Sequence, residues 1–133
     1  MTDQLTYFSV QEMDGITLVS IHDGLTYEQA ITMLEHLAAR DIYHFRCIDI
    51  SAIRISLTKD EVTAMAAHSK SIFKEPNRSA IIAGDDLSYG IIRSLIVYRE
   101  EDAHMQMNVF RDVKSGIIWL NKQKELLKGL NQD

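Results

Sequence analysis

Residues 46–61 read RCIDISAIRISLTKDE, and this stretch decides the fold class. An apolar run extends from Arg46 to Asp49, and a short loop then leads to Thr58. Thr58 and Glu61 have the spacing of a capping box, in which two side chains satisfy backbone N–H groups at the start of a helix. A strand, a loop and a helix in this order form the joint where open α/β sheets bind ligands. The joint carries no Gly-rich phosphate loop and no metal-ligand spacing, so it predicts an architecture more directly than a reaction.

The N-terminal part of the chain has the pattern of a β-hairpin. Leu5–Val10 and Ile16–Ile21 favour strands, and Asp14-Gly15 between them supplies the positive φ of a tight turn. Farther along, Thr26 and Gln29 have capping-box spacing, and apolar residues repeat at three and four after them. The pattern therefore predicts a hairpin followed by an amphipathic helix.

Strands and helices alternate along the rest of the chain. Further strands are predicted over Arg46–Ile50, Ser79–Ala83 and Met105–Phe110, and further helices after Thr58, after Asp85-Asp86 and after Asp112. Pro76 is expected to end the second helix. Such alternation requires crossovers between parallel strands. The sequence thus predicts one α/β domain over residues 1–133, with a mixed, mostly parallel sheet, an antiparallel N-terminal hairpin and about four helices.

Composition excludes several classes of protein. The chain has 133 residues, with 14 Lys and Arg against 19 Asp and Glu, a net charge of −5. This balance argues against a nucleic-acid partner, because such proteins carry a basic stripe. Cys47 is the single cysteine, which excludes an internal disulfide and a paired-cysteine metal site. There is no signal-peptide pattern and no apolar run long enough for a membrane span, so a cytoplasmic location is expected.

Three segments together resemble one known family. RCIDISAIRISLTKDEV, RSAIIAGDDLSYGIIR and VFRDVKSGIIWL, at residues 46–62, 78–93 and 109–120, follow one another as in the SpoIIAA-like family. This family of bacterial domains is grouped with the STAS anti-sigma-factor antagonists and with the CRAL-TRIO lipid-binding fold. The resemblance spans nearly the whole chain. It implies a small α/β domain that binds proteins or small molecules without catalysing a reaction.

The resemblance also points to a candidate phosphorylation site. STAS antagonists carry a phosphorylatable serine in an Asp-Ser-Ser-Gly turn at the start of the helix after this strand, where a helix N-terminus can host a phosphate. Here the four positions are Leu57-Thr58-Lys59-Asp60, so the acceptor serine is replaced by Lys59 and only Thr58 keeps a hydroxyl. Thr58 is interpreted mainly as a helix cap. Its alternative role is that of a phosphoacceptor, with Ser56 as the next candidate.

The carboxyl ends of the predicted strands carry the other polar candidates. Asp49 and Ser51 follow one strand, and Asp85 and Asp86 follow the next, on the edge where α/β sheets bind partners or ligands. Two adjacent carboxylates could hold a cation, but one of them is needed as a helix cap. An enzyme that uses Asp85, Asp86 and Tyr89 is a third-ranked alternative. The five histidines lack zinc-ligand spacing, and no cofactor is expected.

The third predicted helix contains more apolar residues than one packed face requires. Its apolar side chains are Leu87, Tyr89, Ile91, Ile92, Leu95, Ile96, Val97 and Tyr98. Three explanations remain open: deep burial between the sheet and the last helix, a homodimer contact, or a wall of an apolar ligand pocket. Ile96 and Tyr98 are the residues expected to face a partner or ligand.

These observations favour a non-enzymatic, cytosolic interaction or regulatory module that forms a homodimer. No nucleophile, base or metal constellation is evident, and the partner-facing edge is expected at the loops after Ile50 and Ala83. The alternative is a CRAL-TRIO-like carrier of a small apolar ligand or lipid. Its cavity would be formed by the third helix with Phe73, Tyr98 and Trp119. Against the carrier, a chain of this length leaves little volume once its core is packed.

Overall fold

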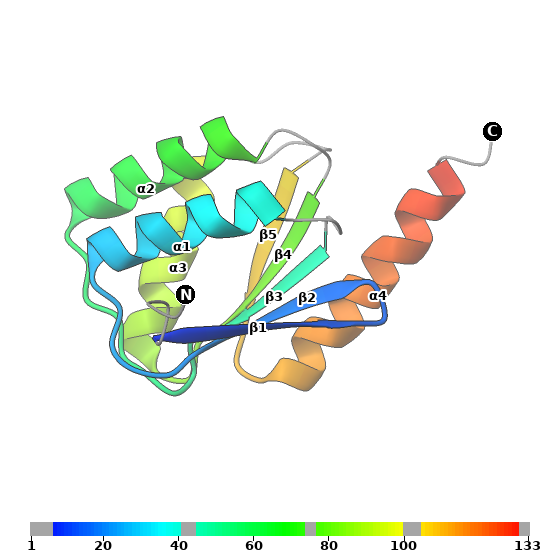
Figure 1. Cartoon of the computed structure of the whole chain (residues 1–133), viewed down its shortest axis with the longest axis horizontal. Helices are drawn as coiled ribbons and strands as arrows, with labels where there is room; N and C mark the ends of the chain where they lie inside the picture. The colour runs from blue at the N-terminus through cyan, green and yellow to red at the C-terminus, as the bar shows by residue number, and fades with distance from the viewer. Residues whose placement is uncertain (1–6, 41–44, 74–76, 100–104, 131–133) are drawn as a thin grey trace.

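The protein is one five-stranded α/β layer structure with four helices (Figure 1). The computed structural model describes residues 7–40, 45–73, 77–99 and 105–130. In chain order the elements are β1 (Phe8–Met13), β2 (Ile16–Ile21), α1 (Tyr27–Arg40), β3 (Phe45–Asp49), α2 (Lys59–Ile72), β4 (Asn77–Ile82), α3 (Asp86–Arg99), β5 (Met105–Phe110) and α4 (Val113–Leu130). This architecture confirms the fold class predicted from the alternating pattern.

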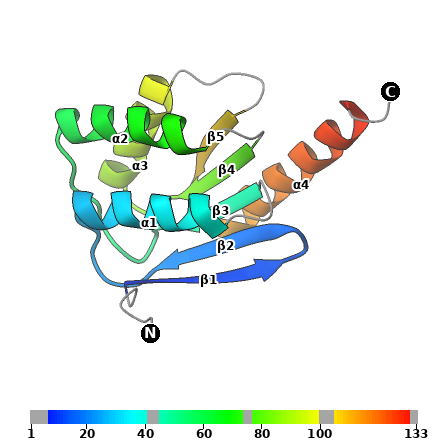
Figure 2. The same ribbon diagram turned by 45° about the horizontal axis from the view of Figure 1, so that its top comes forward.

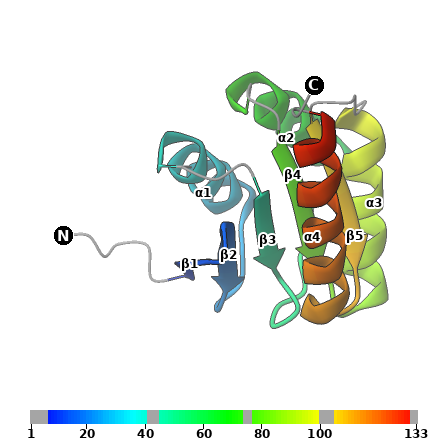
Figure 3. The same cartoon turned by 90° about the vertical axis from the view of Figure 1, so that its right-hand side faces the viewer.

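The strands lie in the sheet in their order along the chain, from β1 to β5 (Figure 3). β1 and β2 are antiparallel, and the remaining neighbours are parallel. Met13 pairs with Ile16, so Asp14 and Gly15 form a two-residue turn, with φ of 54° and 80°. Both values are positive, as a tight hairpin turn of this kind requires. The hairpin was predicted correctly, but its first strand runs on to Met13 instead of ending at Val10, and Leu5 lies outside the described residues.

The four helices cover the two faces of the sheet unequally. Because parallel crossovers share one hand and the strands follow in order, α1, α2 and α3 lie on the same face. α4 follows the last strand and packs alone on the opposite face, over β3, β4 and β5 (Figures 1 and 3). The expectation that α3 is buried between the sheet and the last helix is therefore wrong. α3 lies against α2 and β5 (Figure 2), and its outer side has no covering element among the described residues (Figure 3).

The predicted helix caps are present. Thr26 and Gln29 exchange backbone-to-side-chain hydrogen bonds, and Thr58 and Glu61 do the same at the start of α2. Asp112 accepts a hydrogen bond from the Ser115 backbone N–H at the start of α4. Pro76, expected to end α2, lies outside the described residues, and α2 ends at Ile72. Local chemistry thus sets the beginnings of these helices, as the sequence indicated.

Each face of the sheet has its own apolar core. The core beneath α4 is small and consists of Ile16, Cys47, Ala80, Ile82 and Leu120. α4 packs closely on the sheet at Gly116, where an added Cβ would lie 2.7 Å from Cδ1 of Ile82. The core beneath the three helices is larger and extends over all five strands and the loop that leads to α2. None of the described helices is long and apolar enough to cross a membrane.

Candidate functional site

The loops after β3 and β4 meet at the carboxyl edge of the sheet. The main chain of Ser51 lies beside Gly84, so that a Cβ added to Gly84 would be 3.3 Å from the Ser51 carbonyl oxygen. The Ile50 N–H also donates to the Ile82 carbonyl, at 2.9 Å. The structure therefore brings together the two polar loops that the sequence placed on this edge.

Asp85 caps α3 and is fully engaged in that role. Its Oδ1 accepts from the Ser88 N–H at 2.8 Å, and its Oδ2 accepts from the Ser88 hydroxyl at 2.9 Å. These bonds to Ser88, with a weaker contribution from Arg54 at 3.8 Å, lower the pKa of Asp85. The Ile55 N–H in turn donates to the buried Ser88 Oγ at 3.0 Å. Asp85 thus fixes the loop before α2 to α3, and it is ionised at neutral pH.

Ser88 is a positioning residue that the sequence interpretation missed. It is completely buried, and it joins the Asp85 cap to the backbone of the preceding crossover loop. One sequence signal was available. Ser88 follows Asp85 by three residues, and the side chain of a capping residue accepts a hydrogen bond from the backbone N–H at that position. The contact with Ile55 joins residues 33 positions apart. Sequence spacing alone does not predict such a contact.

Asp49 and Ser51 form a local turn. Asp49 Oδ1 accepts from the Ser51 N–H at 2.9 Å and from its hydroxyl at 2.6 Å. This arrangement is an Asx turn, which stabilises the exit from β3. Among the described residues no three histidine, cysteine or carboxylate side chains are grouped so that they could hold a metal ion. The carboxylates on this edge therefore hold loops in place.

Asp86 and Tyr89 interact with Arg111 at the start of the loop after β5. The Arg111 guanidinium donates to Asp86 Oδ1 at 2.8 Å and lies 4.2 Å from the centre of the Tyr89 ring. The Asp86 side chain is 97% exposed, so this ion pair is weak. Asp86 does not share a hydrogen-bond partner with Asp85 in the described structure, and the two carboxylates act on separate neighbours.

Thr58 and Ser56 are exposed on the loop before α2. The Thr58 hydroxyl accepts from the Glu61 N–H at 3.1 Å, and the Glu61 carboxylate accepts from the Thr58 N–H at 2.9 Å. The hydroxyl therefore serves as a helix cap while it faces solvent. The cap role is confirmed, and the role of phosphoacceptor remains a prediction.

Cys47 is not a nucleophile in the folded chain. Its side chain has no exposed surface beneath α4. Burial, with a smaller contribution from the Asp49 carboxylate, raises the pKa of the thiol to about 12. Because the thiolate is the reactive form, the thiol is inert at neutral pH.

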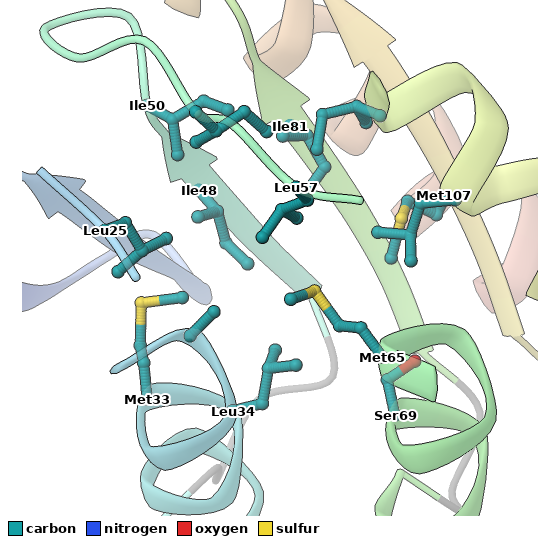
Figure 4. Close-up of a pocket in the computed structure, with 14 residues that line it drawn as sticks. Leu25, Met33, Leu34, Ile48, Ile50, Leu57, Met65, Ser69, Ile81 and Met107 are labelled. Atoms are coloured by element: carbon teal, nitrogen blue, oxygen red, sulfur yellow. The ribbon is translucent and has the colours of Figure 1, made fainter. Parts of the chain in front are cut away.

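An apolar cavity of about 70 Å³ lies between the three helices and the sheet (Figure 4). Its walls come from α1, α2, α3, the sheet and the loop before α2, and include Met33, Met65 and Met107. Ser69 is the polar residue of the lining, and its hydroxyl donates to the Ala66 carbonyl and accepts from Arg99 Nε. Apart from Ser69, the residues that line this cavity are apolar.

α3 lines this cavity with Ile92 and Leu95, as predicted for the third helix, but Phe73, Tyr98 and Trp119 do not line it. Trp119 belongs to the core beneath α4, on the other face of the sheet. Phe73 lies under the guanidinium of the buried Arg46, at 4.2 Å, and Tyr98 is 39% exposed on α3. The full lining of this cavity was missed because apolar residues on helices and strands indicate a core and do not indicate how densely that core is packed.

The outer side of α3 carries the exposed apolar residues of the helix. Val97 is 71% exposed and Leu87 is 51% exposed, whereas Ile96 is half-buried and packs against the core. Two surface hollows, of about 230 and 340 Å³, share Ser94 and Tyr98 and extend toward the start of α2. We call the two hollows together the α2–α3 groove. Its lining residues are Leu57, Lys59, Val62, Ile91, Arg93, Ser94, Val97 and Tyr98.

Comparison with models of protein families finds no match to this chain, and a search of curated proteins finds none that is similar to it. The resemblance to the SpoIIAA-like family therefore stays a prediction that rests on the three segments quoted above.

Proposed function

We propose that this chain is a non-enzymatic, cytosolic interaction or regulatory module of the SpoIIAA-like type. The observation that carries the proposal is the α2–α3 groove, in which apolar side chains stay exposed on the outer side of α3. Val97 is 71% exposed, whereas Ile92 and Leu95 on the same helix are buried. Exposed apolar side chains that line a groove are a common feature of surfaces that bind other proteins.

The chemistry of the polar candidates supports a binding role. Both carboxylate oxygens of Asp85 accept hydrogen bonds from Ser88, and the Thr58 hydroxyl caps α2. A general base needs a carboxylate or imidazole that can reach a substrate proton, and a nucleophile needs an activating base. Asp49, Thr58 and Asp85 instead stabilise the exit from β3 and the starts of α2 and α3.

The experiment compares two charge insertions at equally apolar, exposed sites. Val97→Asp places a carboxylate in the groove, and Leu126→Asp is the matched control on α4, where the side chain is 61% exposed. Proteins crosslinked to each variant in its own host are quantified by mass spectrometry. We expect Val97→Asp to lose the specific partner and Leu126→Asp to keep it, with both variants as stable as the parent. If both retain the same partners, the groove does not bind them.

A homodimer is the second form of interaction that the sequence predicted. Native mass spectrometry of the parent and of Tyr98→Asp reports the subunit number directly. A dimer that becomes a monomer only in Tyr98→Asp would place the contact in the groove. A monomeric parent would remove the homodimer from the proposal.

A carrier of a small apolar molecule is the second candidate function, and the cavity is the observation that favours it. Its volume of about 70 Å³ is too small for a lipid chain in the packed state, so the cargo would be a molecule of few heavy atoms. Native mass spectrometry of gently purified protein tests this candidate. A retained small mass favours the carrier, and a bare chain under the same conditions argues against it.

A further inference from the structure

We propose that the α2–α3 groove receives an acidic amphipathic helix of another protein. This inference rests on the proposed interaction function and adds the chemistry of the partner. It follows from the position of the two hollows, from the charged residues that line them and from the loop residue Leu57, which lines one of them and the cavity.

The two hollows of the groove offer an incoming helix a partly apolar surface. They share Ser94 and Tyr98: one lies on the outer side of α3, and the other lies between α3 and the start of α2. α2 and α3 are neighbours on the same face of the sheet and cross at a steep angle, so an incoming helix would rest mainly on α3 (Figures 1 and 3). A docked helix presents apolar residues at i, i+3, i+4 and i+7 to such a groove.

The charges that line the groove are basic, although the chain as a whole is acidic. Lys59 and Arg93 both line it, and none of its lining residues is acidic. Neither side chain forms an ion pair with any residue that the structure describes. The neighbouring Glu61 carboxylate is directed to the Thr58 N–H at the cap. On a chain with a net charge of −5, this surface favours acidic partners locally.

The same charges make a second copy of this chain a poor occupant. In a two-fold homodimer the patch on one protomer meets the same patch on the other. Arg93 and Lys59 would then face the basic residues of the partner copy, and like charges at an interface are unfavourable. A nucleic acid is also a poor occupant, because the net charge of the chain repels polyanions.

Leu57 lies between the groove and the internal cavity, because it lines both. An apolar anchor that presses on Leu57 from the groove has the void of about 70 Å³ behind it. Leu57 is therefore the apolar side chain of the groove that has unfilled space behind it. This favours a large aliphatic or aromatic anchor on the incoming helix, since such anchors dominate binding energies when they fill a pocket.

The test uses two designed helical peptides that share one apolar face and differ only in the residues beside it. One peptide carries Glu at the flanking positions, and the other carries Lys. Their affinities for the full chain are measured by fluorescence anisotropy at low and high salt. We expect the Glu peptide to bind at least about tenfold more tightly at low salt, and this preference to shrink as salt screens the charges.

Two charge reversals locate the effect. Arg93→Glu acts at the groove, and Lys122→Glu is the matched control on α4, exposed and equal in its change of net charge. Arg93→Glu should lower the affinity of the protein for the Glu peptide by about fivefold or more. Lys122→Glu should change that affinity by less than about twofold. Equal weakening by both reversals would mean that only overall charge matters, and it would overturn the proposal.

A third variant separates this inference from the proposed function. Tyr98→Asp removes an apolar side chain that lines the groove, so it should lower the affinity for both peptides. If both peptides bind equally and only Tyr98→Asp weakens them, the groove is an interaction surface but its partner is not acidic. If neither peptide responds to Tyr98→Asp, helix docking in the groove is refuted, whereas the crosslinking comparison of Val97→Asp and Leu126→Asp still tests the proposed function.

Discussion

Replacing Gly116 by alanine tests how closely α4 packs on the sheet. Helix propensity alone predicts that Gly→Ala inside a helix stabilises the fold by about 1 kcal/mol. At Gly116, however, the new Cβ would lie 2.7 Å from Cδ1 of Ile82 and 3.3 Å from Cβ of Ala80. Carbon atoms pack best at about 3.5–4.0 Å. Ile82 would have to move by about 1 Å to restore that separation, and the methyl group of Ala80 cannot rotate away.

The expected magnitude follows from these distances. Ile82 and Ala80 have no exposed surface, so neither side chain can avoid the new methyl group by moving into solvent. Overpacking a buried site costs about 1–3 kcal/mol, and a contact of this closeness belongs to the upper part of that range. After the gain in helix propensity, Gly116→Ala should be less stable than the parent by about 1–2 kcal/mol.

Gly90→Ala on α3 is the matched control. Gly90 lies in the interior of a helix, is exposed, and has no atom within 4 Å of the position that an added methyl group would take. The same propensity gain applies there without the packing cost, so Gly90→Ala should stabilise the fold by about 1 kcal/mol. The difference between the two variants then isolates the packing cost, at about 2–3 kcal/mol.

Urea denaturation measures both free energies of unfolding. Trp119, the single tryptophan, lies about one turn after Gly116, and its ring is 5.7 Å from that of Phe110, so its fluorescence reports on the perturbed helix. Far-UV circular dichroism should give the same midpoint, with unchanged m-values. A Gly116→Ala variant as stable as Gly90→Ala would refute the claim that α4 is pressed against β4.

Three further predictions concern the cap, the carboxylates and the thiol. Thr58→Ala should lower the free energy of unfolding by about 1 kcal/mol, while Thr58→Ser, which keeps the hydroxyl, should match the parent in the same urea titration. The lowered pKa values of Asp85 and Asp112, set first by bonds from Ser88 and Ser115, mean that the folded chain binds these protons more weakly than the unfolded chain. The two ionised carboxylates stabilise the folded chain above the ordinary carboxyl pKa of about 4, and this stabilisation is lost as pH falls through their lowered pKa values. A variant with Asn at both positions should therefore show a flatter dependence of the free energy of unfolding on pH below about 5. Cys47, with its pKa raised to about 12 and its side chain buried, should resist iodoacetamide at about pH 8 until the chain is unfolded, and rapid alkylation of the native chain would contradict this burial.

The sequence predicted the elements of this fold because their signals are local. The turn at Asp14-Gly15 needs positive φ, and the cap at Thr58 needs a hydroxyl three residues before Glu61. The predicted ends of the strands were less accurate than the predicted strands themselves, since β4 begins at Asn77 and not at Ser79. A strand can extend as far as its neighbours supply backbone partners, and Asn77 pairs with Met105 across the sheet.

The environment of α3 could not be predicted in the same way. An apolar helix can be covered on both sides or on one, and the choice depends on the order of the strands in the sheet. Here the sequential order places three helices on one face and leaves α4 to the other. The exposure of Val97 and the burial of Ile92 on the same helix follow from that arrangement. Periodicity identified the apolar residues without identifying which of them would find a neighbour.

The buried arginines were missed for a related reason. Arg46 stands at the start of an apolar run, which suggested the edge of a strand, yet it is only 2% exposed. Its guanidinium packs over Phe73, which comes from the end of α2. Arg99 is 3% exposed and donates to the Ser69 hydroxyl, 30 residues away. Long side chains can be buried when distant residues supply a ring or an acceptor, and a linear sequence does not display that distance.

The unequal covering of the sheet also relates the two candidate functions to each other. The face beneath α4 is closed by the contact at Gly116, whereas the three-helix face contains both the cavity and the groove. Leu57 lines both of these, so its position affects both volumes. An occupant of the groove and an occupant of the cavity would both contact Leu57. Any coupling between them would therefore pass through this side chain, and it would change both affinities by the same factor.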